Sequence, residues 1–368
     1  MNILLSASFL DIITTIWYIF IALMCLVFMV VIHELGHYFA GKKLGFRVEE
    51  FAIGFGPKIF QRKSKKTGEV FSIRPIPLGG FCQFEGEDED HKSETAFNNQ
   101  KPWKRLIVLF SGAFFNFVSA LIIITLFFTF YGQILPTVNT LYEDSDVYQN
   151  SQLVEGDVIL RVDGKQMNVL GADDVSSRIL ATGDTAVFTI LRDGKQMNVE
   201  VTKSYYTPKD ADGNYFYDDN DQIIKYYGYG FVSSVQPVKL NFFTSLWRSL
   251  SFGFFIVYKI LASIGGLITG SIGMDAAGGP VTVINIMADA SRGGFAMIAY
   301  IVMIISANLA VMNLLPLPAL DGSRMAFTLI EWVRGKPINR NIEGMIHFVG
   351  FILLLGFAFL ADINQFLS

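Results

Sequence analysis

The chain has 368 residues, of which 52% are hydrophobic and 34 are Phe, and its formal net charge is −4 at pH 7. A purely soluble protein would have difficulty burying so many apolar residues, so the composition predicts a polytopic membrane protein with some soluble mass. The two cysteines, Cys25 and Cys82, imply no disulfide framework.

The first apolar stretch, Ile12–Ile32, contains no charged residue and is long enough to cross the hydrocarbon core of a bilayer as a helix. It leads directly into an H-E-x-x-H sequence formed by His33, Glu34 and His37. Imidazoles four residues apart lie on one face of a helix and can bind one divalent ion, and Glu34 is close enough to take a proton from water there. Ionisable groups are costly at membrane depth, so we interpret these three as catalytic rather than as buried polar residues satisfied by helix neighbours.

Three further spans are predicted at about Leu106–Tyr131, Phe295–Leu315 and His347–Ala361, which makes four in all. The segment Phe242–Ile272 is also apolar, but charged residues, glycines and serines interrupt it. We interpret it as a helix that lies along the interface or dips into it, with a fifth span as the alternative.

The distribution of Lys and Arg predicts the orientation of these spans. None precedes the first span, 13 fall within Gly41–Arg105 and four within Pro316–Ile346, so both of these loops are expected in the cytoplasm. The segment Gly132–Asn241 has nine Lys plus Arg against 16 Asp plus Glu, so it is expected outside, together with both termini.

The first cytoplasmic loop has the composition of a small sheet. Phe51–Arg62 and Val70–Phe84 are rich in strand-forming residues and are punctuated by glycines and prolines. Beside the metal-binding helix, such a sheet could dip into the membrane and offer an edge to an extended peptide; an ordinary cytoplasmic hairpin is the equal alternative. The acidic stretch Glu85–Glu94 is expected to be a solvated connector and its His91 a surface residue.

Gly112 and Asn116 stand one helical turn apart near the start of the second span. The small residue allows another backbone to approach closely, and the amide points into the helix bundle. Helix packing, with Asn116 as a hydrogen-bonding residue, and a role at the metal site are equally good explanations of the pair.

The segment after Leu135 has the pattern of a small domain. Its predicted elements are a turn-strand-turn, a short helix and two strands, at Leu153–Gly164, Asp173–Ala181, Thr185–Arg192 and Gln196–Lys203. The heptapeptide DGKQMNV begins at Asp163 and again at Asp193, which we attribute to reuse of a type I′ hairpin turn rather than to a repeat protein. In Tyr205–Tyr229, acidic residues have calcium-loop spacing, but Tyr215 replaces the required Gly, so an exposed hairpin is expected instead.

The third span ends in NLLPLPALDG, from Asn313 to Gly322. Its two prolines remove backbone donors, so the helix must open and leave free carbonyls and amides, which are tolerated at membrane depth only where they line a cavity. Asp321 then offers a third ligand to a metal bound by two His, since an open zinc site takes three protein ligands plus water. A cap for a helix over Ser323–Trp332 is an equally good explanation of Asp321.

In this order along the chain, HELGH, GFGP, PLGG, the Gly112 and Asn116 pair, GDVILRVDG and NLLPLPALDG resemble the site-2 protease family of intramembrane zinc metalloproteases, in particular its bacterial members of regulated intramembrane proteolysis. The resemblance covers nearly the whole chain and implies one Zn²⁺ cofactor and one PDZ-like domain around GDVILRVDG. The residues it implies are His33, His37 and Asp321 as metal ligands, Glu34 as general base, Asn313, Gly54, Phe55 and Gly56 for substrate binding, and Gly112 and Asn116 as active-site support.

Three positions depart from the family pattern. Ala113 stands where Pro is usual, Phe81–Gln83 replaces Tyr-Val after PLGG, and Ser323 replaces a second Gly after LDG. None of these departures removes a ligand, but Ala113 weakens the case for an active-site role of the second-span motif.

The implied activity is hydrolysis of a peptide bond inside the transmembrane segment of a single-span protein already trimmed on the outside, such as an anti-sigma factor or a signal-peptide remnant. A non-catalytic scaffold with a structural zinc is one alternative, but it needs a fourth protein ligand, and His91 and His347 lie far away in the sequence. A metal transporter is another, but it needs more intramembrane carboxylates than Glu34 and Asp321.

The expected fold class is a polytopic α-helical protein of the bacterial cytoplasmic membrane with four transmembrane helices, a membrane-associated β loop and an inserted extracytoplasmic PDZ-like α+β domain. The expected partners are transmembrane protein substrates and the lipid bilayer, without nucleic acid; the sequence gives no oligomeric state. The predicted segments are the first span with HELGH (1–41), the β loop (42–105), the second span (106–131), the PDZ-like domain (135–204), a Tyr/Asp-rich insert and linker (205–241), the interfacial region (242–294), the third span (295–322), a cytoplasmic loop (323–346) and the fourth span (347–368).

Overall fold

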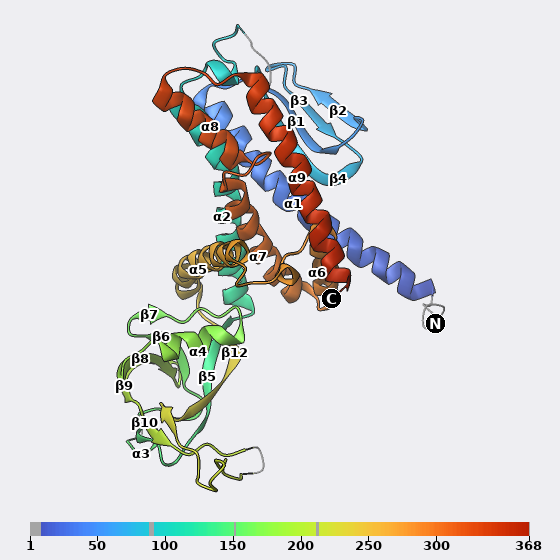
Figure 1. Ribbon diagram of the computed structural model, residues 1–368. Coiled ribbons are helices and arrows are strands. Elements are labelled where there is room, and N and C mark those ends of the chain that lie inside the picture. The colour runs from blue at the N-terminus through green and yellow to red at the C-terminus, as the bar shows by residue number, and fades with distance from the viewer. Residues whose placement is uncertain (1–8, 88–91, 151, 211–212, 368) are drawn as a thin grey trace. The chain divides into compact units, whose positions relative to one another are not determined.

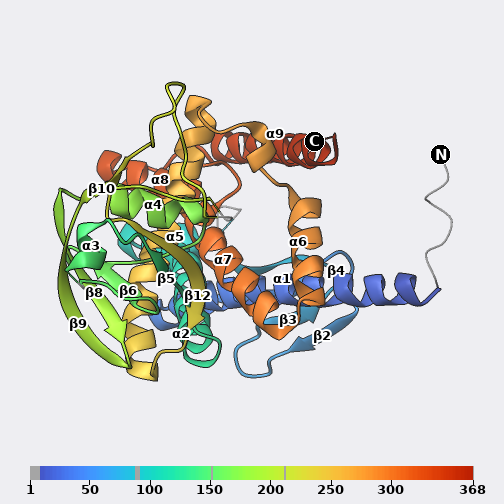
Figure 2. The same cartoon turned by 90° about the horizontal axis from the view of Figure 1, so that it is seen from below.

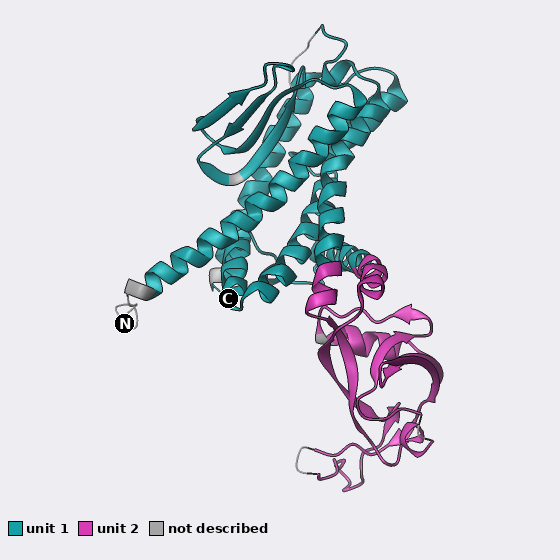
Figure 3. Ribbon diagram, turned by 180° about the vertical axis from the view of Figure 1, so that it is seen from behind, with its two compact units in different colours: residues 1–124, 253–368 teal, residues 125–252 magenta. Residues whose placement is uncertain are grey.

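The computed structural model describes residues 9–87, 92–150, 152–210 and 213–367, so the expectation for His91 lies outside the described residues. The chain divides into two compact units, one of residues 1–124 and 253–368 and one of residues 125–252 (Figure 3). The division falls within two long helices, α2 (Pro102–Phe130) and α5 (Phe242–Thr269).

Long apolar helices and one small sheet make up the first unit (Figure 1). Besides its parts of α2 and α5, its helices are α1 (Phe9–Leu44), α6 (Pro280–Arg292), α7 (Phe295–Leu314), α8 (Asp321–Arg334) and α9 (Arg340–Leu367), with 3₁₀ turns at Phe97–Asn99 and Met274–Ala276. α6 crosses α1 (Figure 2), and Met29 of α1 packs there with Met287 of α6 and Val302 of α7.

Among the described residues, five helices are long and apolar enough to cross a membrane, namely α1, α2, α5, α7 and α9. This supports the predicted polytopic helical membrane protein. The helix beyond the four expected spans is α5, a single helix of 28 residues in the segment interpreted as interfacial. Its Arg248 is buried in the second unit, where the guanidinium donates to Gln133 Oε1 and to the carbonyls of Leu160 and Met167. Because protein surrounds this charge, it is weaker evidence against a span than the sequence indicated, and the number of spans stays a prediction.

The loop after α1 forms a four-stranded sheet in the order β2-β3-β1-β4. The strands are β1 (Val48–Phe55), β2 (Phe60–Lys63), β3 (Val70–Ile73) and β4 (Ile76–Phe84). β1 pairs antiparallel with β4 but parallel with β3, which the sequence did not predict. Gly54 permits the irregular register here, because its φ is +85° and a Cβ on it would stand 2.6 Å from the Arg74 carbonyl oxygen. β4 remains an edge strand and packs along α1.

The second unit holds a sheet in the order β12-β5-β6-β8-β9, with β7 paired to β6. Its elements are β5 (Gln133–Leu141), α3 (Asp146–Gln149), β6 (Val158–Val162), β7 (Lys165–Gln166), α4 (Ala172–Leu180), β8 (Thr185–Arg192), β9 (Lys195–Thr202), β10 (Ser204–Tyr206), β11 (Tyr226–Gly228) and β12 (Phe231–Val238). Inward side chains such as Ile159, Phe188 and Ile190 form its core. Asp163 and Asp193 both have φ near +50° and are each followed by a glycine of positive φ, so both copies of DGKQMNV form the predicted two-residue turns.

The sheet of the second unit extends beyond the domain predicted at 135–204. β12 pairs along its whole length with β5, from Phe231 opposite Leu141 to Val238 opposite Gln133, although the sequence assigned this segment to a linker. Partners so far apart in the chain leave no local signal. Within the Tyr205–Tyr229 segment, β10 pairs with β11, and a bridge joins Lys209 to Tyr215. This agrees with the predicted exposed hairpin.

Candidate metal centre

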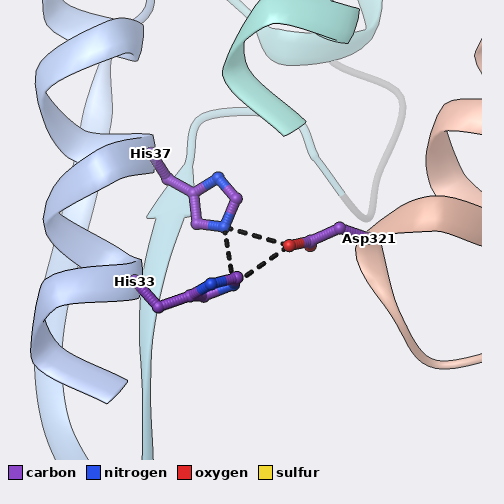
Figure 4. Close-up of side chains that lie close together, drawn as sticks. All are labelled: His33, His37 and Asp321. Carbon is purple, nitrogen blue, oxygen red and sulfur yellow. Dashed lines mark hydrogen bonds and ion pairs between the residues drawn. The ribbon is translucent and has the colours of Figure 1, made fainter. Parts of the chain in front are cut away.

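Two imidazoles from α1 form one side of the site. His33 and His37 are one turn apart, 8% and 7% exposed, and their Nε2 atoms are 3.1 Å from each other (Figure 4). α1 can lie this close to α2 because Gly36 has no side chain: a Cβ on it would stand 2.3 Å from the carbonyl oxygen of Ser111. The spacing of H-E-x-x-H therefore brings both rings to one face, as predicted.

Asp321 reaches the histidines from a segment almost 300 residues later in the chain. Its Oδ2 lies 3.0 Å from Nε2 of His33 and 3.3 Å from Nε2 of His37 (Figure 4). Leu320 occupies the N-cap position of α8, and no side chain caps the helix there. The carboxylate thus faces the imidazoles, and the alternative of Asp321 as a helix cap is not what the structure shows.

The break between α7 and α8 delivers this carboxylate. α7 ends at Leu314, the prolines that follow cannot continue it, and Ala319 adopts a left-handed φ of +71°. A Cβ on Gly322 would stand 2.2 Å from the carbonyl oxygen of Leu315, so the chain folds back tightly on itself before α8 proceeds. The sequence NLLPLPALDG therefore opens the helix as predicted.

The three donor atoms fit a metal ion. His33, His37 and Asp321 are the only group of three or more such ligands within the described ranges, and their donor atoms lie within 4.8 Å of one another. A tetrahedral zinc with bonds of about 2.0–2.1 Å keeps its donors roughly 3.4 Å apart, close to the separations found here. The buried Oδ2 of Asp321 receives no hydrogen bond from the described residues. Two imidazole lone pairs and a carboxylate at such distances repel one another unless a proton or a metal cation lies between them.

Hydrogen bonds behind the ligands orient the rings. The Nδ1–H of His37 donates to the carbonyl oxygen of Val108 at 2.8 Å, which leaves its Nε2 free to bind a metal. Nδ1 of His33 lies 3.4 Å from the amide nitrogen of Asn116 and 3.5 Å from that of Asn313. Oδ1 of the buried Asn116 has no partner among the described residues, so exchanging the amide oxygen and nitrogen lets it accept the His33 Nδ1–H.

Gly112 lies directly against both metal-binding rings. A Cβ on it would stand 2.4 Å from Nε2 of His37 and 2.7 Å from Cε1 of His33, and neither ring has room to move. With Asn116 behind His33, both members of the second-span pair contact the ligands. Gly112 and Asn116 therefore lie at the contact between α1 and α2 and also beside the candidate metal ligands, so the two predicted explanations do not exclude each other.

A cavity of about 380 Å³ opens beside the three ligands. Glu34 lines it from α1, and residues Phe81 to Phe84 of the edge strand β4 line it as well. Gly80 lets this strand lie close to the helix, because a Cβ on it would stand 3.3 Å from Cγ1 of Val30 on α1 and 2.8 Å from the carbonyl oxygen of Ala52. The general base expected from the sequence therefore lies with the ligands and an edge strand in one cavity.

Two charged residues of this cavity were not found from the sequence. Arg324, one turn after Asp321 on α8, forms an ion pair with Glu87 at the cavity wall. Both also line a second cavity of about 210 Å³, whose other charged residues include the buried pair Arg105 and Glu331, 2.7 Å apart. The position of Arg324 one helical turn from a ligand was the only available signal.

The remaining predicted residues lie in different places. Asn313 is beside His33, as described above. Gly54, Phe55 and Gly56 do not line the cavity. The ring of Phe55 instead packs against Gly79, where an added Cβ would stand 2.1 Å from the ring. Their role in substrate binding stays a prediction.

Comparisons with known proteins agree with this chemistry. The sequence model of Peptidase family M50 matches residues 21–357. A protein of Fusobacterium nucleatum with the provisional name of a zinc metalloprotease is 32% identical over 94% of this chain and 97% of its own length. A similarly named protein of Clostridium perfringens is 32% identical over 95% and 98%, and the zinc metalloprotease RasP of Geobacillus kaustophilus is 27% identical over 89% and 92%.

Replacing Asp321 by Ala should lower zinc affinity as strongly as His33→Ala does, because each change leaves two protein ligands. Metal analysis of the purified protein should give about one zinc per chain for wild type and well below one for either variant. Full zinc content in Asp321→Ala would remove this carboxylate from the ligand set.

Gly112→Ala should weaken zinc binding roughly 10–100-fold, because the added methyl group displaces both imidazoles. Competition with a chelator measures the affinity. The matched control is Gly344→Ala in α9, where a Cβ meets no atom within 4 Å. Equal affinities in the two variants would show that the contact of Gly112 with the rings is not required.

Proposed function

This chain belongs to peptidase family M50, the zinc metalloproteases of the site-2 type, and we propose that it cuts a peptide bond within the transmembrane segment of a single-span protein. The observation that carries the proposal is the meeting of His33, His37 and Asp321 beside Glu34 in one cavity. Three protein donors leave a position open for water and substrate, which distinguishes a catalytic from a structural zinc site.

Different residues of the chain are proposed to carry out metal binding, proton transfer and orientation. Zinc held by the three ligands would polarise a carbonyl and lower the pKa of water. Glu34 takes a proton from the attacking water and later gives it to the leaving amine. The amides of Asn116 and Asn313 flank Nδ1 of His33, which supports an orientation of the ring that presents Nε2. Asn313 is further proposed to donate to a substrate carbonyl.

The substrate must be extended before it can be cut, because a helix hides its amides in its own hydrogen bonds. β4 is the edge of its sheet and lines the cavity, so an extended segment can pair with it next to Glu34. Helix-breaking residues near the cut site should therefore favour cleavage. We propose substrates already trimmed outside, such as anti-sigma factors or signal-peptide remnants.

The proposed location is a bacterial cytoplasmic membrane, with the sheet of β1 to β4 on the cytoplasmic side and the second unit outside. The support is the excess of Lys and Arg in Gly41–Arg105 and of Asp and Glu in Gly132–Asn241. In this arrangement the second unit, proposed to be a PDZ-like domain, selects substrates rather than taking part in hydrolysis.

Glu34→Gln should lower the rate of cleavage by a factor of roughly 10²–10⁴ or more, because an amide cannot act as a base. The variant should keep its zinc, because this side chain is not proposed as a ligand. The measurements are cleavage of a transmembrane substrate and metal content on the same sample. Activity near that of wild type would contradict this mechanism. Loss of zinc would instead indicate that Glu34 is a metal ligand.

Cysteine labelling checks the topology. After Cys25 and Cys82 are replaced, a cysteine at Lys65 should be protected from a membrane-impermeant reagent in intact cells, and one at Asp219 should react. The reverse pattern would invert the orientation.

Removal of the second unit tests its role. Since Gln133 and Val238 are paired, a short Gly/Ser linker can replace residues 134–237. Arg248→Gln belongs in the same variant, because Arg248 keeps Gln133 as an acceptor but loses the carbonyls of Leu160 and Met167. The variant should bind zinc, cut a pre-trimmed substrate and now admit untrimmed ones. Zinc binding without cleavage of either would make the unit part of the catalytic assembly.

A further inference from the structure

A second large hollow lies in the first unit, away from the metal centre. It is a groove of about 640 Å³ between α1 and the β1 to β3 part of the sheet, within the size range of ligand sites. Leu35 and Tyr38 line it from α1, and successive residues turn about 100° round a helix, so these side chains leave the face that carries His33 and His37. Of the residues that the structure describes, none lines both this groove and the metal cavity.

The floor of the groove is apolar and aromatic. Tyr38 meets Phe51 edge to face with ring centres 5.7 Å apart, and Phe51 stacks on Phe71 at 6.1 Å. Phe71 remains 38% exposed, although it lies on a strand between two others. An apolar surface left open beside a transmembrane helix is suited to a hydrocarbon chain.

Four positive charges line one rim of the groove. Arg62, Lys63, Lys65 and Lys66 all belong to the β2–β3 hairpin, are exposed and have no ion-pair partner within the described part of the chain. The acid nearest to them in the hairpin is Glu69, which is already engaged by Lys42 at 2.9 Å and by the Tyr38 hydroxyl at 3.2 Å. Among the described residues, no acidic side chain pairs with the cations of this rim.

The groove lies beside the C-terminal part of α1, where the apolar helix gives way to basic residues. α1 is apolar up to the metal-binding turn and ends at Leu44 with Lys42 and Lys43 in its last turn. The hydroxyl of Tyr38 accepts from Lys42, so the ring faces the groove while its polar end is at the level of the lysines. Aromatic and basic residues in this order mark the boundary between hydrocarbon and headgroups.

We propose that this groove binds an anionic phospholipid of the surrounding bilayer. Its phosphate contacts the basic rim from Arg62 to Lys66, and one acyl chain lies along Leu35, Tyr38 and Phe71. A soluble anion would gain nothing from the aromatic floor, and a neutral lipid would gain nothing from four uncompensated cations. An acidic peptide would match the rim, but a floor built on a transmembrane helix favours a lipid.

The direct test is native mass spectrometry of the full-length, zinc-loaded protein in detergent. Phosphatidylglycerol and phosphatidylcholine with the same acyl chains are added separately, and soluble glycerol phosphate or an acidic peptide is added as competitor. The expected result is one retained phosphatidylglycerol, bound on the order of tenfold or more tightly than phosphatidylcholine. Equal retention of the two lipids, or displacement by either competitor, would overturn the proposal.

Variants locate the site. Removing the four rim charges as Arg62→Gln, Lys63→Gln, Lys65→Gln and Lys66→Gln should abolish the preference for the anionic lipid. The control removes four exposed charges of the same unit that do not line the groove, as Lys92→Gln, Lys101→Gln, Arg334→Gln and Lys336→Gln, and should keep it. Equal loss in both would mean that net charge alone attracts the lipid.

A second pair tests the apolar floor. Phe71→Ala should weaken retention of both lipids several-fold, whereas Phe60→Ala, an exposed residue of the same sheet that does not line the groove, should not. Equal behaviour of the two would place the acyl chain elsewhere. Zinc content measured on every variant shows that the first unit remains folded, because its ligands come from both ends of the chain.

Discussion

The structure depends on holding three electron-pair donors, two imidazole nitrogens and one carboxylate oxygen, about 3 Å from one another inside the first unit. With both Nε2 atoms deprotonated this arrangement is repulsive unless a cation lies between the donors, and burial makes the repulsion stronger because little water screens it. The surrounding fold supplies the constraint. The carbonyl of Val108 fixes one ring, two amides flank the other, and an opened helix end delivers the carboxylate.

Close backbone contacts make this constraint possible. Gly36 allows α1 to touch α2, Gly112 leaves space for both rings, and Gly80 brings β4 against the helix beside Glu34. Gly322 lets the chain turn back on itself after the prolines. A side chain at any of these positions would press against neighbouring backbone or against a ligand. β4 is the edge strand of its sheet and also lines the metal cavity. The strand beside the site is therefore the one with which an extended substrate could pair.

Local sequence patterns predicted much of this arrangement. H-E-x-x-H fixed the face of α1, two prolines predicted the break after α7, and two Asp-Gly turns predicted hairpins with positive φ. Pairings between distant segments were not predictable: β1 beside β3 in parallel, β12 beside β5, and Glu87 beside Arg324. The local pattern left Asp321 equally explained as a cap or a ligand, because one carboxylate before a helix fits both roles. The family resemblance implied the ligand role, and the distances from Asp321 to the histidines agree with it.

Extended X-ray absorption spectroscopy of the zinc-loaded protein tests the central claim most directly, because it reports the atoms bound to the metal. Bonds to imidazole nitrogen and carboxylate oxygen are about 2.0–2.2 Å long, and a bond to thiolate sulfur is about 2.3 Å. Zinc bound by His33, His37 and Asp321 should show only nitrogen and oxygen atoms at bonding distance, together with the outer scattering of two imidazoles. Cys82 lines the same cavity, so a sulfur at the longer distance, or the signal of a single imidazole, would contradict the ligand set on which the account depends.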